Sequence, residues 1–140
     1  MNNDVIFSSN TTEWETPKDF YNCLDAEFHF TLDPCATPEN AKCPHYFTKN
    51  QDGLKQFWGN DTVFYNPPYG RQIGKWVEHA FNTHWVNDNT IVVLLPARTD
   101  TKWFHKYIYR KAEIRFIKGR LKFGGSKNNA PFPNMLVIWR

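Results

Sequence analysis

The segment Asn66-Pro67-Pro68-Tyr69 places a side-chain amide, two prolines and an aromatic ring side by side. Adjacent prolines fix the backbone φ angle and offer carbonyl groups without N–H donors. An exocyclic amino group on a purine becomes more nucleophilic when acceptors hold its two hydrogens, and the Asn66 side-chain oxygen and the Pro67 carbonyl are candidate acceptors. Tyr69 would stack on a base turned out of its helix. The segment therefore suits methyl transfer to such a group, with placement and electrostatics supplying most of the rate.

The elements that would position this segment alternate between helix and strand. Apolar residues at helical spacing predict a helix over 73–85, and the continuous apolar run 90–95 predicts a strand buried on both faces. A helix is expected to begin at Thr16-Pro17, with Thr16 as N-cap. Residues 34–57 are expected to be irregular, with a short helix near Glu39. The remaining predictions are strands over 28–33, 62–65, 113–117 and 135–139, and a helix over 99–109.

This alternation predicts an α/β fold with a compact, mostly parallel sheet and helices on both of its faces. Ligands of such sheets bind at the carboxyl ends of the strands, near the point where the strand order reverses. Polar or proline-containing sequence follows the expected strand ends at Leu32, Tyr65 and Leu95. The 66–69 segment should then lie at the ligand-binding edge. A plain Pro-Pro turn between a strand and a helix is the alternative interpretation.

Composition and charge fit a single folded domain that contacts a polyanion. The chain has 140 residues and a net charge of +3, and 41% of its residues are apolar and 17% aromatic. Between residues 102 and 122, eight basic residues accompany a single acid. This run indicates either a solvated face or a surface for nucleic acid. Residues 1–12 are expected to be a flexible tail and 13–140 one domain.

The cysteines favour a reducing compartment. Their number, three, is odd, and no hydrophobic signal segment precedes them. We therefore expect a cytoplasmic protein, in a bacterium or an infected host cell, that has no membrane partner. Cys35, Cys43 and His45 lack the paired spacing of a zinc site, so we expect no metal. No nearby His–acid relay would activate Cys35 as a nucleophile.

Several separated segments together resemble one family, the small phage-encoded DNA N6-adenine methyltransferases. The likeness covers about residues 14–139 and rests on motifs that follow one another in the expected order. These motifs are 14–17, 32–37 with Asn40, 51–54, 66–70, 94–101, 119–124 and 130–133. The resemblance implies a Rossmann-like methyltransferase fold, S-adenosylmethionine as the methyl donor, and adenine N6 in DNA as the acceptor.

The resemblance also implies roles for single residues. Thr16 and Pro17 would hold the amino-acid end of the donor, Asp33 would lie near its methionine part, and 52–54 would meet its adenosine. The loop after the first strand departs from methyltransferases at large, because it has no Gly-x-Gly pattern. Trp14 is a further candidate for lying against the donor. The expected donor-binding residues are Trp14, Thr16, Pro17, Asp33, Pro34, Cys35, Ala36, Asp52, Gly53, Leu54 and Asn66, and the catalytic ones are Asn66, Pro67, Pro68 and Tyr69.

Basic residues near the strand ends are candidates for DNA contacts. Arg98 follows the buried strand and would meet a phosphate or the flipped nucleotide, with an ion pair to Asp100 as the alternative. No separate target-recognition domain is expected, so any sequence selectivity would come from loops and the basic C-terminal third. The candidate DNA-binding residues are Arg71, Arg98, Lys102, Arg120 and Lys122.

Two other kinds of function stay open on the sequence. The 66–69 motif also suits the side-chain amide of a protein glutamine or the N4 amino group of cytosine. Glutamine methyltransferases, however, generally carry the glycine-rich first loop that is missing here. The other possibility is a catalytically inactive relative that only binds DNA, and the intact motif argues against it.

Overall fold

A computed structural model describes residues 14–124 and 129–140, and the tail expected over 1–12 lies outside them. The described residues form a six-stranded sheet in the order β2-β1-β3-β4-β6-β5. Its strands are β1 (Leu32–Asp33), β2 (His45–Tyr46), β3 (Val63–Tyr65), β4 (Ile91–Pro96), β5 (Glu113–Phe116) and β6 (Asn134–Trp139). The helices are α2 (Lys18–Phe28), α3 (Ile73–Asn87) and α4 (Lys102–Tyr107), with a 3-10 turn η1 (Gly53–Lys55).

The sheet is mixed, which corrects the expectation of a mostly parallel one. Strands β2, β1, β3 and β4 are parallel neighbours, whereas β6 runs antiparallel to both β4 and β5. Parallel neighbours need a crossover connection, usually a helix. No helix forms among the described residues between β5 and β6. The chain therefore returns antiparallel, and β6 lies between β4 and β5.

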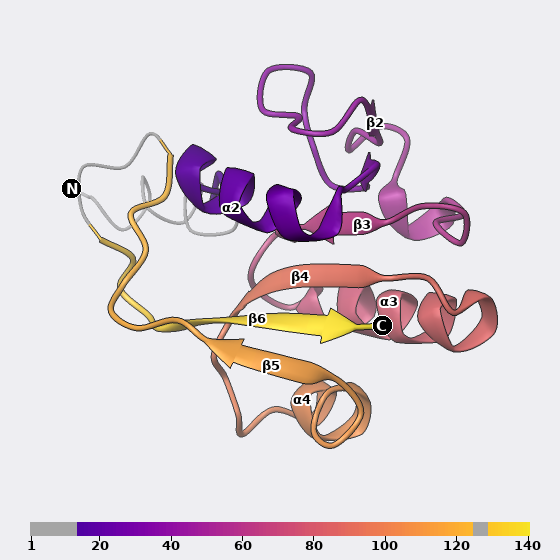
Figure 1. Cartoon of the computed structure of the whole chain (residues 1–140). Coiled ribbons are helices and arrows are strands. Elements are labelled where there is room, and N and C mark those ends of the chain that lie inside the picture. The colour runs from indigo at the N-terminus through magenta and orange to yellow at the C-terminus, as the bar shows by residue number, and fades with distance from the viewer. Residues whose placement is uncertain (1–13, 125–128) are drawn as a thin grey trace.

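Alternate residues of β4 divide the core between the two faces of the sheet. Ile91, Val93 and Leu95 pack with α3 and α4, whereas Val92 and Leu94 pack with α2. Figure 1 shows α2 in front of the sheet and the paler α3 and α4 behind it. The predictions of a strand buried on both sides and of helices on both faces are thus confirmed.

The helices differ from the predictions mainly at their ends. The helix predicted over 73–85 is present as α3, but the one predicted over 99–109 is the shorter α4, capped by the Thr101 hydroxyl, which accepts from the Phe104 N–H. Thr16 as N-cap of α2 is wrong. Pro17 occupies the cap position, no side chain caps the helix, and the Thr16 hydroxyl contacts Asn66 instead. No helix among the described residues has the length and apolar character needed to cross a bilayer.

The region between α2 and β3 holds the other corrections. Helix α2 continues to Phe28, and His29 ends it in the left-handed conformation, so the strand expected over 28–33 shrinks to β1. Residues 34–57 contain β2 and η1, neither of which was predicted. A turn replaces the helix expected near Glu39. A two-residue strand is too short to show alternation, which is why the sequence does not predict β2.

Candidate active site

Two adjoining pockets lie beside the point at which the order of the parallel strands in the sheet reverses. Strand β2 lies on one side of β1 and β3 on the other, so the order reverses between β1 and β3. Loops that leave the carboxyl ends of strands beside such a reversal diverge and leave room for a ligand. Cys35, Asn40 and Pro68 line both pockets. The larger has a volume of about 530 Å³ and the smaller about 130 Å³, against roughly 300–1,000 Å³ for small-molecule sites in general.

The larger pocket lies between the loop after β1 and the loop before η1. Gly53 brings these loops together, because a Cβ at this position would lie 2.1 Å from the carbonyl oxygen of Pro34. Any side chain there would force the loops apart. The glycine that allows close backbone approach is thus Gly53, at the start of η1. The loop after β1 has no Gly-x-Gly pattern. Asp52 precedes Gly53 with a positive φ of 56°, and its carboxylate accepts from the Leu54 N–H at 3.2 Å.

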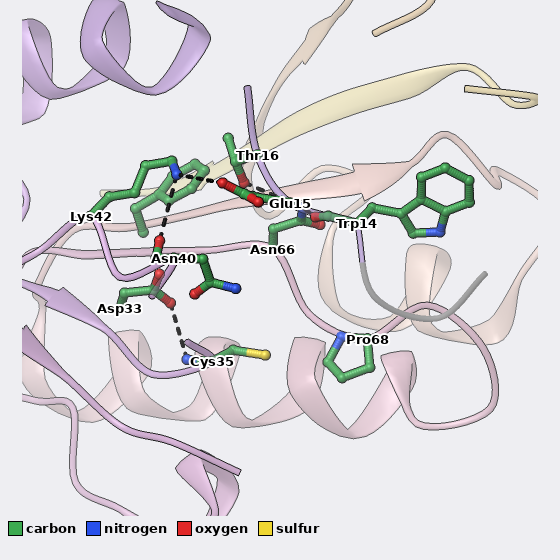
Figure 2. A pocket seen from close by; sticks show the side chains of 10 residues that line it. Trp14, Glu15, Thr16, Asp33, Cys35, Asn40, Lys42, Asn66 and Pro68 are labelled. Atoms are coloured by element: carbon green, nitrogen blue, oxygen red, sulfur yellow. Dashed lines mark hydrogen bonds and ion pairs between the residues drawn. The ribbon is translucent and has the colours of Figure 1, made fainter. Parts of the chain in front are cut away.

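The smaller pocket carries charges of both signs. Lys42 Nζ lies 3.6 Å from Glu15 Oε2, and Asp33, only 8% exposed, also lines the pocket. Figure 2 shows these side chains, with dashed lines from Lys42 to Glu15 and from the Cys35 backbone nitrogen to Asp33. Burial raises the pKa of Asp33 to about 6, although the Cys35 N–H bond and the Lys42 charge act in the opposite direction. Lys42 is not among the residues predicted from the sequence, where its only signal is that no other lysine or arginine lies between residues 34 and 48.

Asn66 follows β3 and is one of the residues that line the smaller pocket. The Nδ2 group donates to the backbone carbonyl of Trp14 and to Thr16 Oγ1, the latter at 3.3 Å. Its Oδ1 atom is buried and has no hydrogen-bond partner in the described part of the chain. Because an unpartnered buried acceptor costs roughly 1–3 kcal/mol, such an atom in a pocket-lining residue is suited to accept a ligand's hydrogen.

Tyr69 ends the motif with its ring in the core and at the larger pocket. Its hydroxyl donates to the Leu94 carbonyl at 3.2 Å and accepts from Asn134 Nδ2 at 3.3 Å. Burial raises the pKa of this phenol well above its usual range, so the hydroxyl stays protonated. Stacking of a base on Tyr69 stays a prediction. The anchoring residue Asn134 was not predicted from sequence, because it lies on β6, far along the chain.

The residues expected to bind the donor divide between the two pockets. Pro17 and Leu54 are not among the lining residues of either. The smaller pocket is lined by Trp14, Thr16, Asp33, Cys35 and Asn66, and the larger by Pro34, Cys35, Ala36, Asp52 and Gly53. The segment predicted to be catalytic borders both, through Asn66 and Pro68 at the smaller pocket and Pro68 and Tyr69 at the larger.

The candidate DNA-binding residues follow strands that end at this same edge. Strands β4 and β5 are both antiparallel to β6 and so run in the same direction as β3, which places the segments after them at the same edge of the sheet as the pockets. Arg71 lines the larger pocket, and no ion pair between Arg98 and Asp100 is present in the described ranges. The side chains of Arg71, Arg98, Lys102, Arg120 and Lys122 are all exposed.

Arg115 and Cys43 make contacts within the fold and lie outside the two pockets. Arg115, one of the eight basic residues in the run 102–122, pairs with Glu27 at 2.7 Å and Glu113 at 2.9 Å. Cys43 is buried against the Tyr21 hydroxyl, and burial raises the pKa of its thiol to about 11. Within residues 14–124 and 129–140, no group of three or more His, Cys, Asp or Glu side chains is placed to hold a metal.

Comparisons with known proteins point to one family. The model of a family described as DNA N-6-adenine-methyltransferase (Dam) matches residues 6–140. A DNA N-6-adenine-methyltransferase of Escherichia phage T1 is 33% identical over 113 residues, which are 77% of this chain and 45% of that protein. A relative with the same name in Haemophilus phage HP1 (strain HP1c1) is 29% identical over 134 residues, 90% of this chain and 77% of that protein. The matched region thus spans about half the length of the T1 protein. Because the family model covers nearly the whole chain, the chain belongs to the DNA N-6-adenine-methyltransferase (Dam) family.

Proposed function

We propose that this chain transfers a methyl group from S-adenosylmethionine to the N6 amino group of adenine in DNA. The observation that carries the proposal is Oδ1 of Asn66, a residue that lines a pocket beside the strand ends: this oxygen is buried and has no hydrogen-bond partner among residues 14–124 and 129–140. Membership of the family and the names of the two phage relatives support the same reaction. The strand order 2-1-3-4 in the parallel half, with helices on both faces, supports a Rossmann-like methyltransferase fold over a single domain.

The two pockets fit the two parts of the donor. S-adenosylmethionine would supply a methyl group that its sulfonium already activates, so the chain has to place the acceptor and needs no strong base. The larger pocket has the volume for a nucleoside and is lined by Asp52 and Gly53. The smaller one offers Asp33 to an α-ammonium group and Lys42 to an α-carboxylate. An amino-acid zwitterion therefore finds a partner for each of its charges.

The catalytic motif would hold the adenine amino group from the side of its hydrogens. Asn66 Oδ1 would accept one hydrogen and the Pro67 carbonyl the other, which localises the lone pair on N6. Pro68 lines both pockets, so the motif borders the whole donor site. Tyr69 would support the flipped base with its ring, since its hydroxyl is already engaged in the core. The proton displaced from N6 would pass to solvent.

DNA would lie across the edge at which the strands end. Exposed Arg71, Arg98 and Lys102 would meet phosphates on one side of the pockets, and Arg120 and Lys122 on another. Contacts of this type position a duplex without reading its bases, and they weaken steeply as salt rises. The cytoplasm of a bacterium or of an infected cell, where such DNA is found, is the proposed location.

The deciding experiment incubates the purified protein with tritiated S-adenosylmethionine and unmethylated DNA and analyses the nucleosides by mass spectrometry. We expect N6-methyladenine, and we expect Asn66→Ala to abolish it while the circular dichroism spectrum is unchanged. Asn82→Ala, an exposed asparagine on α3, is the matched control and should retain full activity. N4-methylcytosine or labelled protein instead would assign a different acceptor. Donor binding without transfer to DNA would argue against the proposal, and no donor binding at all would favour an inactive DNA-binding relative.

A further inference from the structure

The side-chain amide of Asn66 must point its oxygen toward the acceptor's amino group, a requirement that the symmetric carboxylate of an aspartate would not have. A carboxylate offers an acceptor on both sides, whereas an amide offers an oxygen on one side and two N–H donors on the other. A half-turn about the last side-chain bond exchanges the two. If the nitrogen of Asn66 faced the pocket, its hydrogens would meet the hydrogens of an incoming amino group. Catalysis by Asn66 therefore requires something that holds the amide in one orientation.

The structure holds the amide by its nitrogen, through two acceptors that come from the segment before α2. The backbone carbonyl of Trp14 and the Thr16 hydroxyl oxygen both lie against Nδ2 of Asn66. Reversing the amide would place its oxygen against the Trp14 carbonyl, which has no hydrogen to offer. The atom left over is Oδ1, which is buried and unpartnered among the described residues. These contacts join residues 50 and 52 positions apart in the sequence.

The segment that carries these two acceptors is itself fixed. The Trp14 ring packs against Phe123 at 5.3 Å and Phe132 at 5.4 Å between ring centroids. The Glu15 carbonyl accepts from the Gly124 N–H at 2.8 Å, and Thr16 is only 7% exposed. Because both ends of the short segment are anchored, its oxygens are held at defined positions.

We propose that Thr16 is a positioning residue, which acts with the Trp14 carbonyl to lock the Asn66 amide with its oxygen toward the acceptor's amino group. This inference rests on the proposed methyl transfer, because it concerns the atom that receives the N6 hydrogen. It differs from a role in holding the donor, which is what the family resemblance implies for Thr16. It also assigns a reason for asparagine at position 66, since a carboxylate there would set a second oxygen against the Trp14 carbonyl.

The kinetic test compares Thr16→Val, which keeps the shape but removes the acceptor, with Thr16→Ser, which keeps the acceptor. We expect Thr16→Val to lower kcat about tenfold, the effect of losing one hydrogen bond, while KM for the donor changes little. Thr16→Ser should restore most of kcat. Thr83→Val, the same change at another buried threonine, on α3, is the matched control. A Thr16→Val enzyme with normal kcat and a raised KM for the donor would overturn the lock and leave Thr16 as a donor contact.

A second measurement needs no substrate and separates the lock from the reaction. In 15N-edited spectra of the ligand-free protein, the Asn66 side-chain NH2 pair is identified by its loss in Asn66→Ala. We expect the pair to shift in Thr16→Val and to stay in place in Thr83→Val. An unshifted pair would refute the lock whether or not the enzyme methylates DNA.

Asn66→Asp extends the test if Thr16→Val fails to fold. Aspartate supplies two acceptor oxygens, so a site that needs only an acceptor would accept it. The lock predicts instead that Asn66→Asp loses most of kcat, because its second oxygen meets the Trp14 carbonyl. Full activity of Asn66→Asp would contradict the lock, while N6-methyladenine formation by the wild type would still stand.

Discussion

The Asn134 side chain donates to the Tyr69 hydroxyl at 3.3 Å and thereby ties the proposed catalytic motif, residues 66–69, to the antiparallel half of the sheet. Asn134 opens β6 and also donates to the Leu95 carbonyl at 3.2 Å. The motif follows β3, and β4 separates β3 from β6. The hydroxyl of Tyr69 is therefore an anchor, and only its ring is left for a ligand.

Tyr69→Phe should separate these two functions of the side chain. It removes the bonds to Leu94 and Asn134 but keeps the ring, so we expect a loss of about 1–3 kcal/mol in the free energy of unfolding, because buried partners are left unsatisfied. Methylation at low temperature should stay close to normal. Urea denaturation and an activity assay check both expectations. A stable but inactive Tyr69→Phe would mean that the hydroxyl itself takes part in the reaction.

Asp33 should make donor binding depend on pH. Its pKa is raised from 3.8 to about 6 by burial, so the folded state holds the proton more tightly than the unfolded state, and ionisation of Asp33 lowers stability as the pH rises between these values. A bound α-ammonium group would favour the ionised carboxylate. Donor affinity should therefore fall as the pH drops through about 6, with proton uptake when the donor leaves.

Calorimetry with S-adenosylhomocysteine in buffers of different ionisation enthalpy measures this proton. Asp33→Asn should bind more weakly above pH 6 and should lose the pH dependence in that range. If wild-type affinity is the same on both sides of that pH, Asp33 does not meet the ammonium group of the donor.

Lys42 should strengthen the binding of donor analogues that have a carboxylate over those that lack one. It lines the smaller pocket, 3.6 Å from Glu15, and its side chain is 16% exposed. We expect Lys42→Met to weaken S-adenosylhomocysteine about tenfold or more, the range of a lost charged hydrogen bond, and to leave methylthioadenosine, which has no carboxylate, nearly unaffected. Lys55→Met, on an exposed lysine of η1, is the control. Equal weakening of both ligands would place Lys42 away from the carboxylate.

Arg98 should act on DNA and not on the donor. It is exposed at the carboxyl end of β4, so Arg98→Ala should weaken DNA binding and reduce the slope of log affinity against log salt by about one. Arg115→Ala serves as a comparison, because that guanidinium is held by Glu27 and Glu113 and its loss should lower stability without changing the salt slope. Fluorescence anisotropy over a salt series measures the slope. A donor affinity that falls as much as DNA affinity would count against this role.

The sequence by itself determined the features that depend only on neighbouring residues in the chain. Apolar periodicity over 73–85 and the apolar run 90–95 predict α3 and β4, because side-chain spacing within an element follows from its own geometry. The motif at 66–69 and its place after a strand are read in the same way. The positions of Asn66 and Asp33 at one edge follow from the general rule for parallel strands.

Tertiary structure decided what depends on partners far apart in the chain. Three features have no signal in the local sequence. They are the antiparallel pairing of β5 with β6, the pairing of the two-residue β2, and the contacts of Asn66 with the segment before α2. Threonine is a favoured N-cap residue, yet the Thr16 hydroxyl accepts a hydrogen bond from the Asn66 amide and does not cap α2. The tertiary packing brings Asn66 next to this hydroxyl. Local propensity is worth a few tenths of a kcal/mol to about 1 kcal/mol per residue, whereas burial and satisfied polar groups across the sheet contribute more, so the long-range contacts prevail.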